Sequence, residues 1–200
     1  MNAILSDDRL YWFVNRGTGV ILLLLMTASV LLGVLATVRT TSRRWPRFVT
    51  QALHRNVALL ATGLLIAHVG VAVYDSYVDL TVVDSFVPFL AGYESFWIAL
   101  GTISLDLTVM AVVTSLARHR FGRRRWRALH LTTYLAWALG LVHGFGIGTD
   151  RSTPWSLALT ATCIGMVAVA GVVRLVGMSR ERALESEIQS ALGERIGETA

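Results

Sequence analysis

Residues 53 to 74, LHRNVALLATGLLIAHVGVAVY, form an apolar stretch that is long enough to cross a lipid bilayer as one helix. The stretch nevertheless carries two histidines, His54 and His68, which are fourteen residues apart. An ionisable side chain inside a membrane is costly unless something satisfies it, so such a residue is a functional candidate by default. The stretch therefore predicts a membrane-spanning helix that places two polar groups at two depths.

The composition of the whole chain agrees with a membrane protein. Of its 200 residues 54% are hydrophobic, and the mean hydropathy of +0.58 is too high for a soluble domain of this length. All 18 basic residues are arginines, and they gather at the ends of apolar segments, which indicates membrane orientation and not a nucleic-acid partner. The single cysteine, Cys163, excludes a disulfide framework and a cysteine-ligated metal cluster.

Five segments are apolar and long enough to span, which predicts an all-α, multi-pass protein of the bacterial cell membrane. They are residues 11–38, 53–74, 95–117, 128–149 and 155–177. We expect residues 1–177 to form the transmembrane bundle. Residues 178–200 are charged, with apolar residues at four-residue intervals, and predict a short amphipathic cytoplasmic helix.

Charge asymmetry predicts the orientation of the spans. Residues 39–47 hold four arginines and residues 118–127, RHRFGRRRWR, hold six, and neither loop contains an acid. Residues 75–94 hold four acids and no base, and their apolar part is too short to cross, so an interfacial or re-entrant segment is expected there. Basic loops lie in the cytoplasm, which puts the N-terminus outside and the C-terminus inside.

The predicted span 128–149 repeats the histidine pattern with His130 and His143, thirteen residues apart. Both histidine-bearing spans run from the cytoplasm outwards, so we expect an inner pair of His54 with His130 and an outer pair of His68 with His143. Two imidazoles fill both axial positions of a haem iron, which suits electron transfer better than oxygen binding. The four histidines predict the ligands of two stacked haems.

Ideal helical geometry fits the first histidine-bearing span better than the second. Fourteen residues leave His54 and His68 roughly 40° apart around the helix and about 21 Å apart along it. Thirteen residues put His130 and His143 about 140° apart, so a tightened turn, a kink or a position in the first turn must rotate one of them. Because glycine weakens helices, distortion is expected near His143, where four glycines occur: Gly140, Gly144, Gly146 and Gly148.

Other residues are candidates for supporting the cofactors. Gly19 and Gly33 are fourteen residues apart and would make room at the outer and inner haem levels, although ordinary membrane helix packing also explains them. Arg55 and Arg127 flank the inner pair and are candidates for holding haem propionates, with topology-setting charge as the alternative. Asp106 lies in the middle of a span and predicts either a proton relay or a bond to a polar neighbour.

The histidine spacing resembles the ferric reductase-like transmembrane module shared by ferric reductases, NADPH oxidases and the haem subunit of the methionine sulfoxide reductase system. The phrases WFVNRGTGV, RALHLTTYLAW and HGFGIGTD resemble its small bacterial members, and the likeness covers about residues 10–177. The resemblance implies two b-type haems, ligated by the four histidines, and electron passage across the membrane. The chain departs from the larger oxidases in having five predicted spans instead of six. It also has no FAD- or NADPH-binding domain and no glycine-rich nucleotide fingerprint.

These observations predict the membrane electron-transfer component of an oxidoreductase, not a complete enzyme. The donor would be a cytoplasmic flavoprotein or a membrane quinol. The acceptor would be ferric iron, oxygen or an extracytoplasmic redox protein. One alternative is a quinol-linked haem subunit of a dedicated periplasmic reductase. An alternative from another class is a transporter or scaffold in which the histidines relay protons or pack.

Overall fold

The structure, a computed structural model, describes residues 8–37 and 46–198, and within these every regular element is a helix. The helices are α2 (Asp8–Thr37), α3 (Arg47–Tyr74), α4 (Ser95–Leu116), α5 (Arg118–Leu131), α6 (Thr133–Ile147) and α7 (Pro154–Glu198). The arginines predicted to set the topology at positions 39, 43 and 44 lie outside the described residues. The all-α fold class is confirmed.

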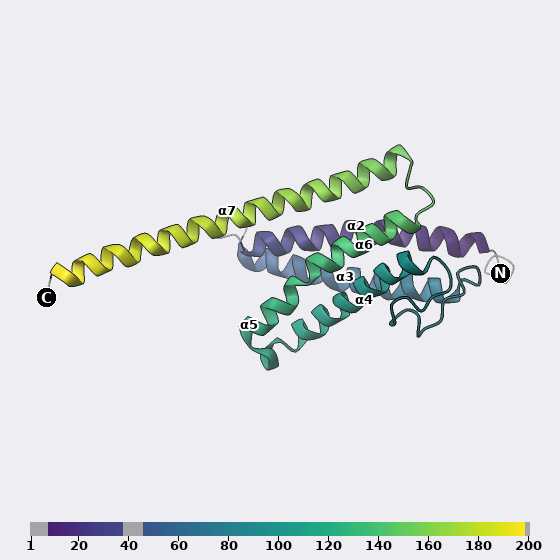
Figure 1. Cartoon of the computed structure of the whole chain (residues 1–200), viewed down its shortest axis with the longest axis horizontal. Coiled ribbons are helices and arrows are strands. Elements are labelled where there is room, and N and C mark those ends of the chain that lie inside the picture. Colours follow the sequence, from purple (N-terminus) through teal and green to yellow (C-terminus); the bar gives the residue numbers. More distant parts are fainter. Residues whose placement is uncertain (1–7, 38–45, 199–200) are drawn as a thin grey trace.

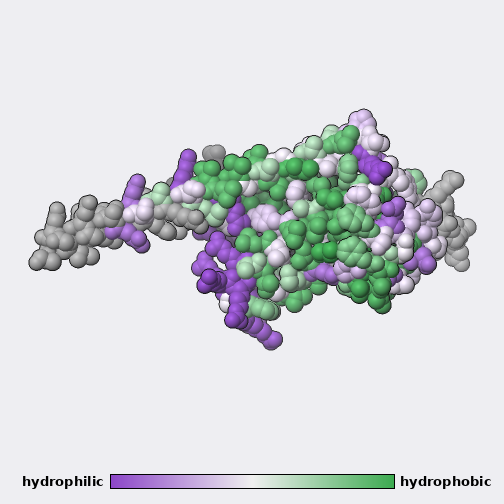
Figure 2. All heavy atoms as spheres, in the orientation of Figure 1, coloured by the Kyte–Doolittle hydropathy of each residue, from purple (hydrophilic) through white to green (hydrophobic). Residues whose placement is uncertain are grey.

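Four of these helices are long and apolar enough to cross a membrane: α2 from Leu10, α3, α4, and α7 up to Arg180. Large apolar side chains cover the outside of the bundle, including Leu60 and Ile66 on α3, which are 61% and 68% exposed. Figure 2 shows this apolar surface as a broad green region, with hydrophilic residues gathered towards its ends. Such a surface is expected where lipid, not water, surrounds the helices.

The predicted span 128–149 is not one helix, because the chain changes from α5 to α6 at Thr132. The Thr132 N–H donates to the Leu129 carbonyl, 3.2 Å away and three residues back, which is the tighter 3₁₀ pattern. The Thr132 and Thr133 hydroxyls also donate to backbone carbonyls, of Leu129 and His130, and so compete with regular helix bonds. α6 then continues unbroken to Ile147, so the predicted distortion near His143 is wrong: it lies beside His130.

This tightened turn acts in the direction that the thirteen-residue spacing requires. Thirteen residues at about 100° each fall roughly 140° short of four complete turns. A 3₁₀ turn advances each residue by about 120°, so overwinding between His130 and His143 reduces that shortfall. The tightened turn at Thr132 therefore supplies part of the rotation that we expected from the glycines.

The C-terminal part of the chain continues α7 without a break, so the bundle and the tail share one 45-residue helix. Figure 1 shows the last turns of α7 extending well beyond the other helices. The apolar positions of the tail, apart from Ile188, have side chains outside the described set. The prediction that the tail is amphipathic stays a prediction.

The bundle is built from two helix pairs, with α2 packed on α3 and α4 packed on α6. α2 also contacts α6 and α7, and so joins the two pairs (Figure 1). Small residues permit these close approaches, since Ala99 on α4, Ala136 on α6 and Cys163 on α7 are completely buried. Among the described residues, α3 is not in extensive backbone contact with α5 or α6, although His54 of α3 faces His130 of α5.

The acidic segment 75–94 folds into turns and bends that pack on one end of the bundle. Its Leu80 and Ala91 are buried against Ile98 of α4, with Ile147 of α6 packed beside them. The Asp84 carboxylate accepts hydrogen bonds from the N–H and hydroxyl groups of Thr81, at 2.8 and 2.7 Å. At least one acid of this segment therefore stabilises local structure.

Candidate functional site

The four predicted histidines meet in two pairs at two levels of the bundle. At the inner level, His54 of α3 faces His130 of α5, with ring centroids 6.0 Å apart and ring planes at 82°. At the outer level, His68 of α3 lies close enough to His143 of α6 for a mutual electrostatic interaction. The structure therefore brings together the residues that the sequence analysis paired, across the space between α3 and α5–α6.

Each histidine of α3 is held by a residue of α2. His54 Nδ1 donates to the Ser29 carbonyl oxygen at 2.9 Å, and a carbonyl can only accept. His68 Nδ1 lies 3.0 Å from the Thr18 hydroxyl, which is also within hydrogen-bond distance of the carbonyls of Val14 and Asn15. Nδ1 is therefore the protonated nitrogen of the neutral His54 ring, which leaves its Nε2 with a free lone pair.

The histidines of α5 and α6 are held in the same way by α4. His143 Nδ1 donates to the Trp97 carbonyl oxygen at 2.7 Å, so its Nε2 is also unprotonated in the neutral ring. His130 Nδ1 lies 3.4 Å from the Ser115 hydroxyl, which accepts a hydrogen bond from Trp126. The Trp126 ring stacks on the His130 ring at 5.2 Å and 21°, which fixes its orientation further.

These contacts fit a metal held between two imidazoles. A hydrogen bond from Nδ1 to an oxygen is the usual arrangement that orients a metal-binding histidine and presents Nε2 to the metal. Two imidazoles that bind one metal at about 2 Å each have ring centroids about 6 Å apart, close to the inner pair here. In the part of the chain that the structure describes, no Nε2 of the four has a hydrogen-bond partner.

Glycines lie directly against three of the four rings. A Cβ placed on Gly19 would lie 3.5 Å from His68 Cε1, and one on Gly33 would lie 3.4 Å from His54 Cε1. A Cβ on Gly101 of α4 would lie only 2.7 Å from His143 Nδ1. The lack of a side chain is required for the ring to take its place at Gly101, whereas a Cβ at Gly19 or Gly33 would make an ordinary contact.

The remaining predicted residues are not part of the histidine contacts. Arg55 and Arg127 are exposed beside the inner pair, and within the described residues neither has a hydrogen-bond or ion-pair partner. Asp106 lies half-buried on α4, also without such a partner, between the levels marked by Gly101 and Ser115. The fifth histidine of the sequence, His119, is exposed on α5.

The sequence analysis missed the residues of α2 and α4 that hold the histidines: Thr18, Ser29, Trp97, Gly101 and Ser115. One signal was present, because Gly101 and Ser115 are fourteen residues apart. That is the spacing of Gly19 and Gly33 and of His54 and His68, and it places two residues on one helix face at two depths. His54 and His143 donate to backbone carbonyls instead, and such partners cannot be predicted from residue type because every residue has a carbonyl.

Comparisons with known proteins identify a family for most of the chain. No curated protein and no solved structure matches the sequence significantly. A family model described as a domain of unknown function, DUF8596, matches residues 10–150, which include α2 from Leu10, α3, α4, α5, α6 and all four paired histidines. The chain therefore belongs to the DUF8596 family.

Proposed function

We propose that this protein is a membrane cytochrome b that carries electrons through two bis-histidine haems, from a cytoplasmic donor to an acceptor on the opposite side. The observation that carries the proposal is that His54 faces His130 at one level, while His68 and His143 come within electrostatic range at the other. In His54 and His143, Nδ1 donates to a backbone carbonyl, and Nε2 of the neutral ring carries a free lone pair. Helix packing alone does not require four histidines to be oriented in this way.

The residues of the chain would bind, orient and shield the cofactors, and the haem irons would supply one-electron redox chemistry when bound. His54 with His130 would hold the inner group, and His68 with His143 the outer group. The oxygens of Ser29, Thr18 and Trp97 would keep their imidazoles in the metal-binding tautomer. Arg55 and Arg127 are proposed to face the inner propionates, and Asp106 is proposed as a proton relay or polar contact.

The donor is proposed to be a cytoplasmic flavoprotein or a membrane quinol. The acceptor is proposed to be ferric iron, oxygen or an extracytoplasmic redox protein. A quinol-linked subunit of one periplasmic reductase is the nearest variant of this function. Haem reduction by quinol in isolated membranes, without added flavoprotein, would identify that variant.

An optical spectrum tests the proposed function. The protein, expressed with ample haem and purified in detergent, is expected to show the sharp α and Soret bands of low-spin b haem after dithionite reduction. The pyridine haemochrome assay is expected to give two haems per chain, since there are two histidine pairs. A colourless preparation of folded protein would contradict the proposal and favour a transporter or scaffold.

The proposal includes five membrane crossings, with α5 and α6 together forming the fourth, and residue labelling tests this. We expect Arg120→Cys on α5 to react with a membrane-impermeant thiol reagent only after permeabilisation of the cells. Ser152→Cys, in the turn between α6 and α7, should react in intact cells. Both positions are exposed, and the native Cys163 is buried and contributes little background. Equal labelling of both variants in intact cells would mean that α5 and α6 do not cross.

A further inference from the structure

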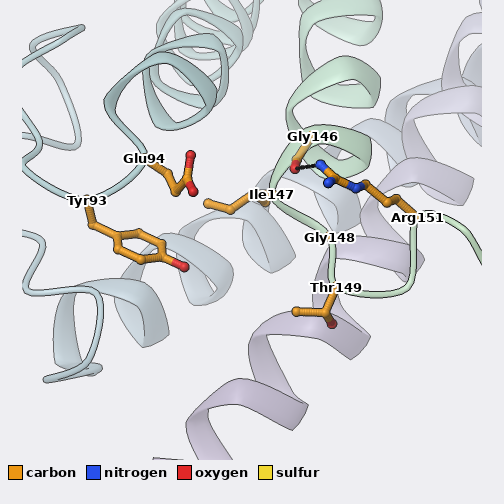
Figure 3. Close-up of a pocket in the computed structure, with 7 residues that line it drawn as sticks. All are labelled: Tyr93, Glu94, Gly146, Ile147, Gly148, Thr149 and Arg151. Atoms are coloured by element: carbon orange, nitrogen blue, oxygen red, sulfur yellow. Dashed lines mark hydrogen bonds between the residues drawn. The ribbon is translucent and has the colours of Figure 1, made fainter.

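A pocket of about 320 Å³ lies at the outer end of the bundle and is not used by the histidine pairs. Its lining consists of Tyr93, Glu94, Gly146, Ile147, Gly148, Thr149 and Arg151. Figure 3 shows Tyr93 and Glu94 on one side of the pocket, and Thr149 and Arg151 on the other. Its volume suits a small molecule, and the exposure of Glu94, Thr149 and Arg151 makes it accessible from water.

The pocket is next to the outer histidine pair. Gly146 follows His143 by three residues on α6, a rise of about 4.5 Å along the helix. The Trp97 ring packs on Gly146 so closely that it would collide with any Cβ there. The carbonyl of the same Trp97 accepts the hydrogen bond from His143 Nδ1. One residue thus contacts both the pocket wall and an outer histidine.

The two charged groups of the pocket are available for a ligand. Within the described residues, the Glu94 carboxylate has no hydrogen bond or ion pair, and the Arg151 guanidinium donates only to the Gly146 carbonyl, at 3.4 Å. Glu94 also has a left-handed backbone (φ 38°), which is unusual for a residue other than glycine and often found at binding sites. Partial burial, and then the proximity of Tyr77 and Glu94, raise the pKa of Tyr93, so its phenol stays a hydrogen-bond donor at neutral pH.

The turn that carries Arg151 is fixed in place by α2. Arg16 Nε donates to the Asp150 carboxylate at 2.9 Å, and the Arg16 guanidinium lies over the Trp155 ring at 5.7 Å. The Arg151 N–H donates to the Gly148 carbonyl at 3.3 Å, which closes the turn. These contacts fix the backbone of the turn from which the Arg151 side chain extends, and a fixed backbone favours a preformed binding site.

We propose that this pocket binds a small, water-soluble, one-electron acceptor that presents an anionic group to Arg151 and a hydrogen-bond donor to Glu94. The inference rests on the proposed function and locates where electrons leave the protein. Each acceptor molecule gains one electron, and the outer redox centre loses one. The pocket volume of about 320 Å³ suits a small molecule, which is why a small molecule is the proposed immediate acceptor.

Two octahedral one-electron oxidants of opposite charge test the pocket. Protein reduced with dithionite and freed of excess reductant is mixed in a stopped-flow instrument with ferricyanide, an anion, or with hexaammineruthenium(III), a cation. Arg151→Gln is expected to slow reoxidation by ferricyanide about tenfold and to speed reoxidation by the ruthenium complex, and Glu94→Gln is expected to do the opposite. Arg125→Gln, an equal charge change on α5 at the other end of the bundle, should change either rate less than twofold.

A binding measurement provides a readout that requires no electron transfer. Ferrocyanide cannot oxidise or reduce the reduced protein, so calorimetric titration measures only its binding, which Arg151→Gln should weaken about tenfold. The pocket assignment would be overturned if Arg151→Gln kept the haem content, both reoxidation rates and the ferrocyanide affinity of the wild type. That result would leave the proposed function intact. A wild-type protein without haem would instead overturn the proposed function, and with it this inference.

Discussion

His68→Ala is expected to reduce the haem content of the purified protein from two per chain to one. The variant removes one imidazole of the outer pair, and an iron with one of its two axial ligands missing is held far less firmly. His54 lies about 21 Å from His68 along α3, so the inner pair should be unaffected, because distant sites act independently. The measurement is the pyridine haemochrome assay, together with the area of the α band after dithionite reduction.

Two controls separate ligand loss from misfolding in this experiment. His119→Ala removes the exposed histidine of α5 and should leave both haems in place. His68→Gly purified with added imidazole should regain part of the lost absorbance, since a free imidazole can occupy the vacated position. Two haems per chain in His68→Ala would exclude His68 as a ligand and remove the outer pair from the proposal.

The histidine spans could be predicted from sequence because membrane insertion leaves a strong and regular signal. A buried histidine in an apolar helix is conspicuous, and a fourteen-residue spacing fixes one helix face. The spacing of His54 and His68 therefore predicted that both lie on one helix face at two depths. The arginine clusters beside the spans predicted the direction of each span, and hence which histidines share a level.

The break at Thr132 was not predictable in the same way. Glycine has a lower helix propensity than threonine, so the four glycines from Gly140 to Gly148 were the expected site of distortion. The break lies instead at Thr132 and Thr133, whose hydroxyls are each 2.7 Å from a backbone carbonyl. Threonine does this in some helices and not in others, and surrounding packing determines the outcome. The polar partners on α2 and α4 were missed for a related reason, since their role depends on which helix packs beside them.

Gly101→Ala is expected to remove most of the outer haem while the inner haem remains. The added Cβ would lie 2.7 Å from His143 Nδ1 and 2.8 Å from Cε1, closer than real Cβ atoms approach other groups. The ring cannot move away freely, because its Nδ1 is bonded to the Trp97 carbonyl at 2.7 Å. Overpacking of this kind costs about 1–3 kcal/mol. Here it would turn His143 Nε2 away from the proposed outer haem iron. Haem content should fall towards one per chain, with the remaining spectrum that of the inner site.

A series of glycine variants makes this prediction specific. Alanine is favoured over glycine inside a helix by about 1 kcal/mol, so substitution without a clash should stabilise the fold slightly. Gly63→Ala on α3 meets no atom within 4 Å and should keep both haems. Gly19→Ala would make an ordinary contact of 3.5 Å with His68 and should cause a small loss or none. If Gly101→Ala retains the same haem content as Gly63→Ala, the His143 ring does not occupy this position in the protein, and Trp97 cannot be the group that orients it.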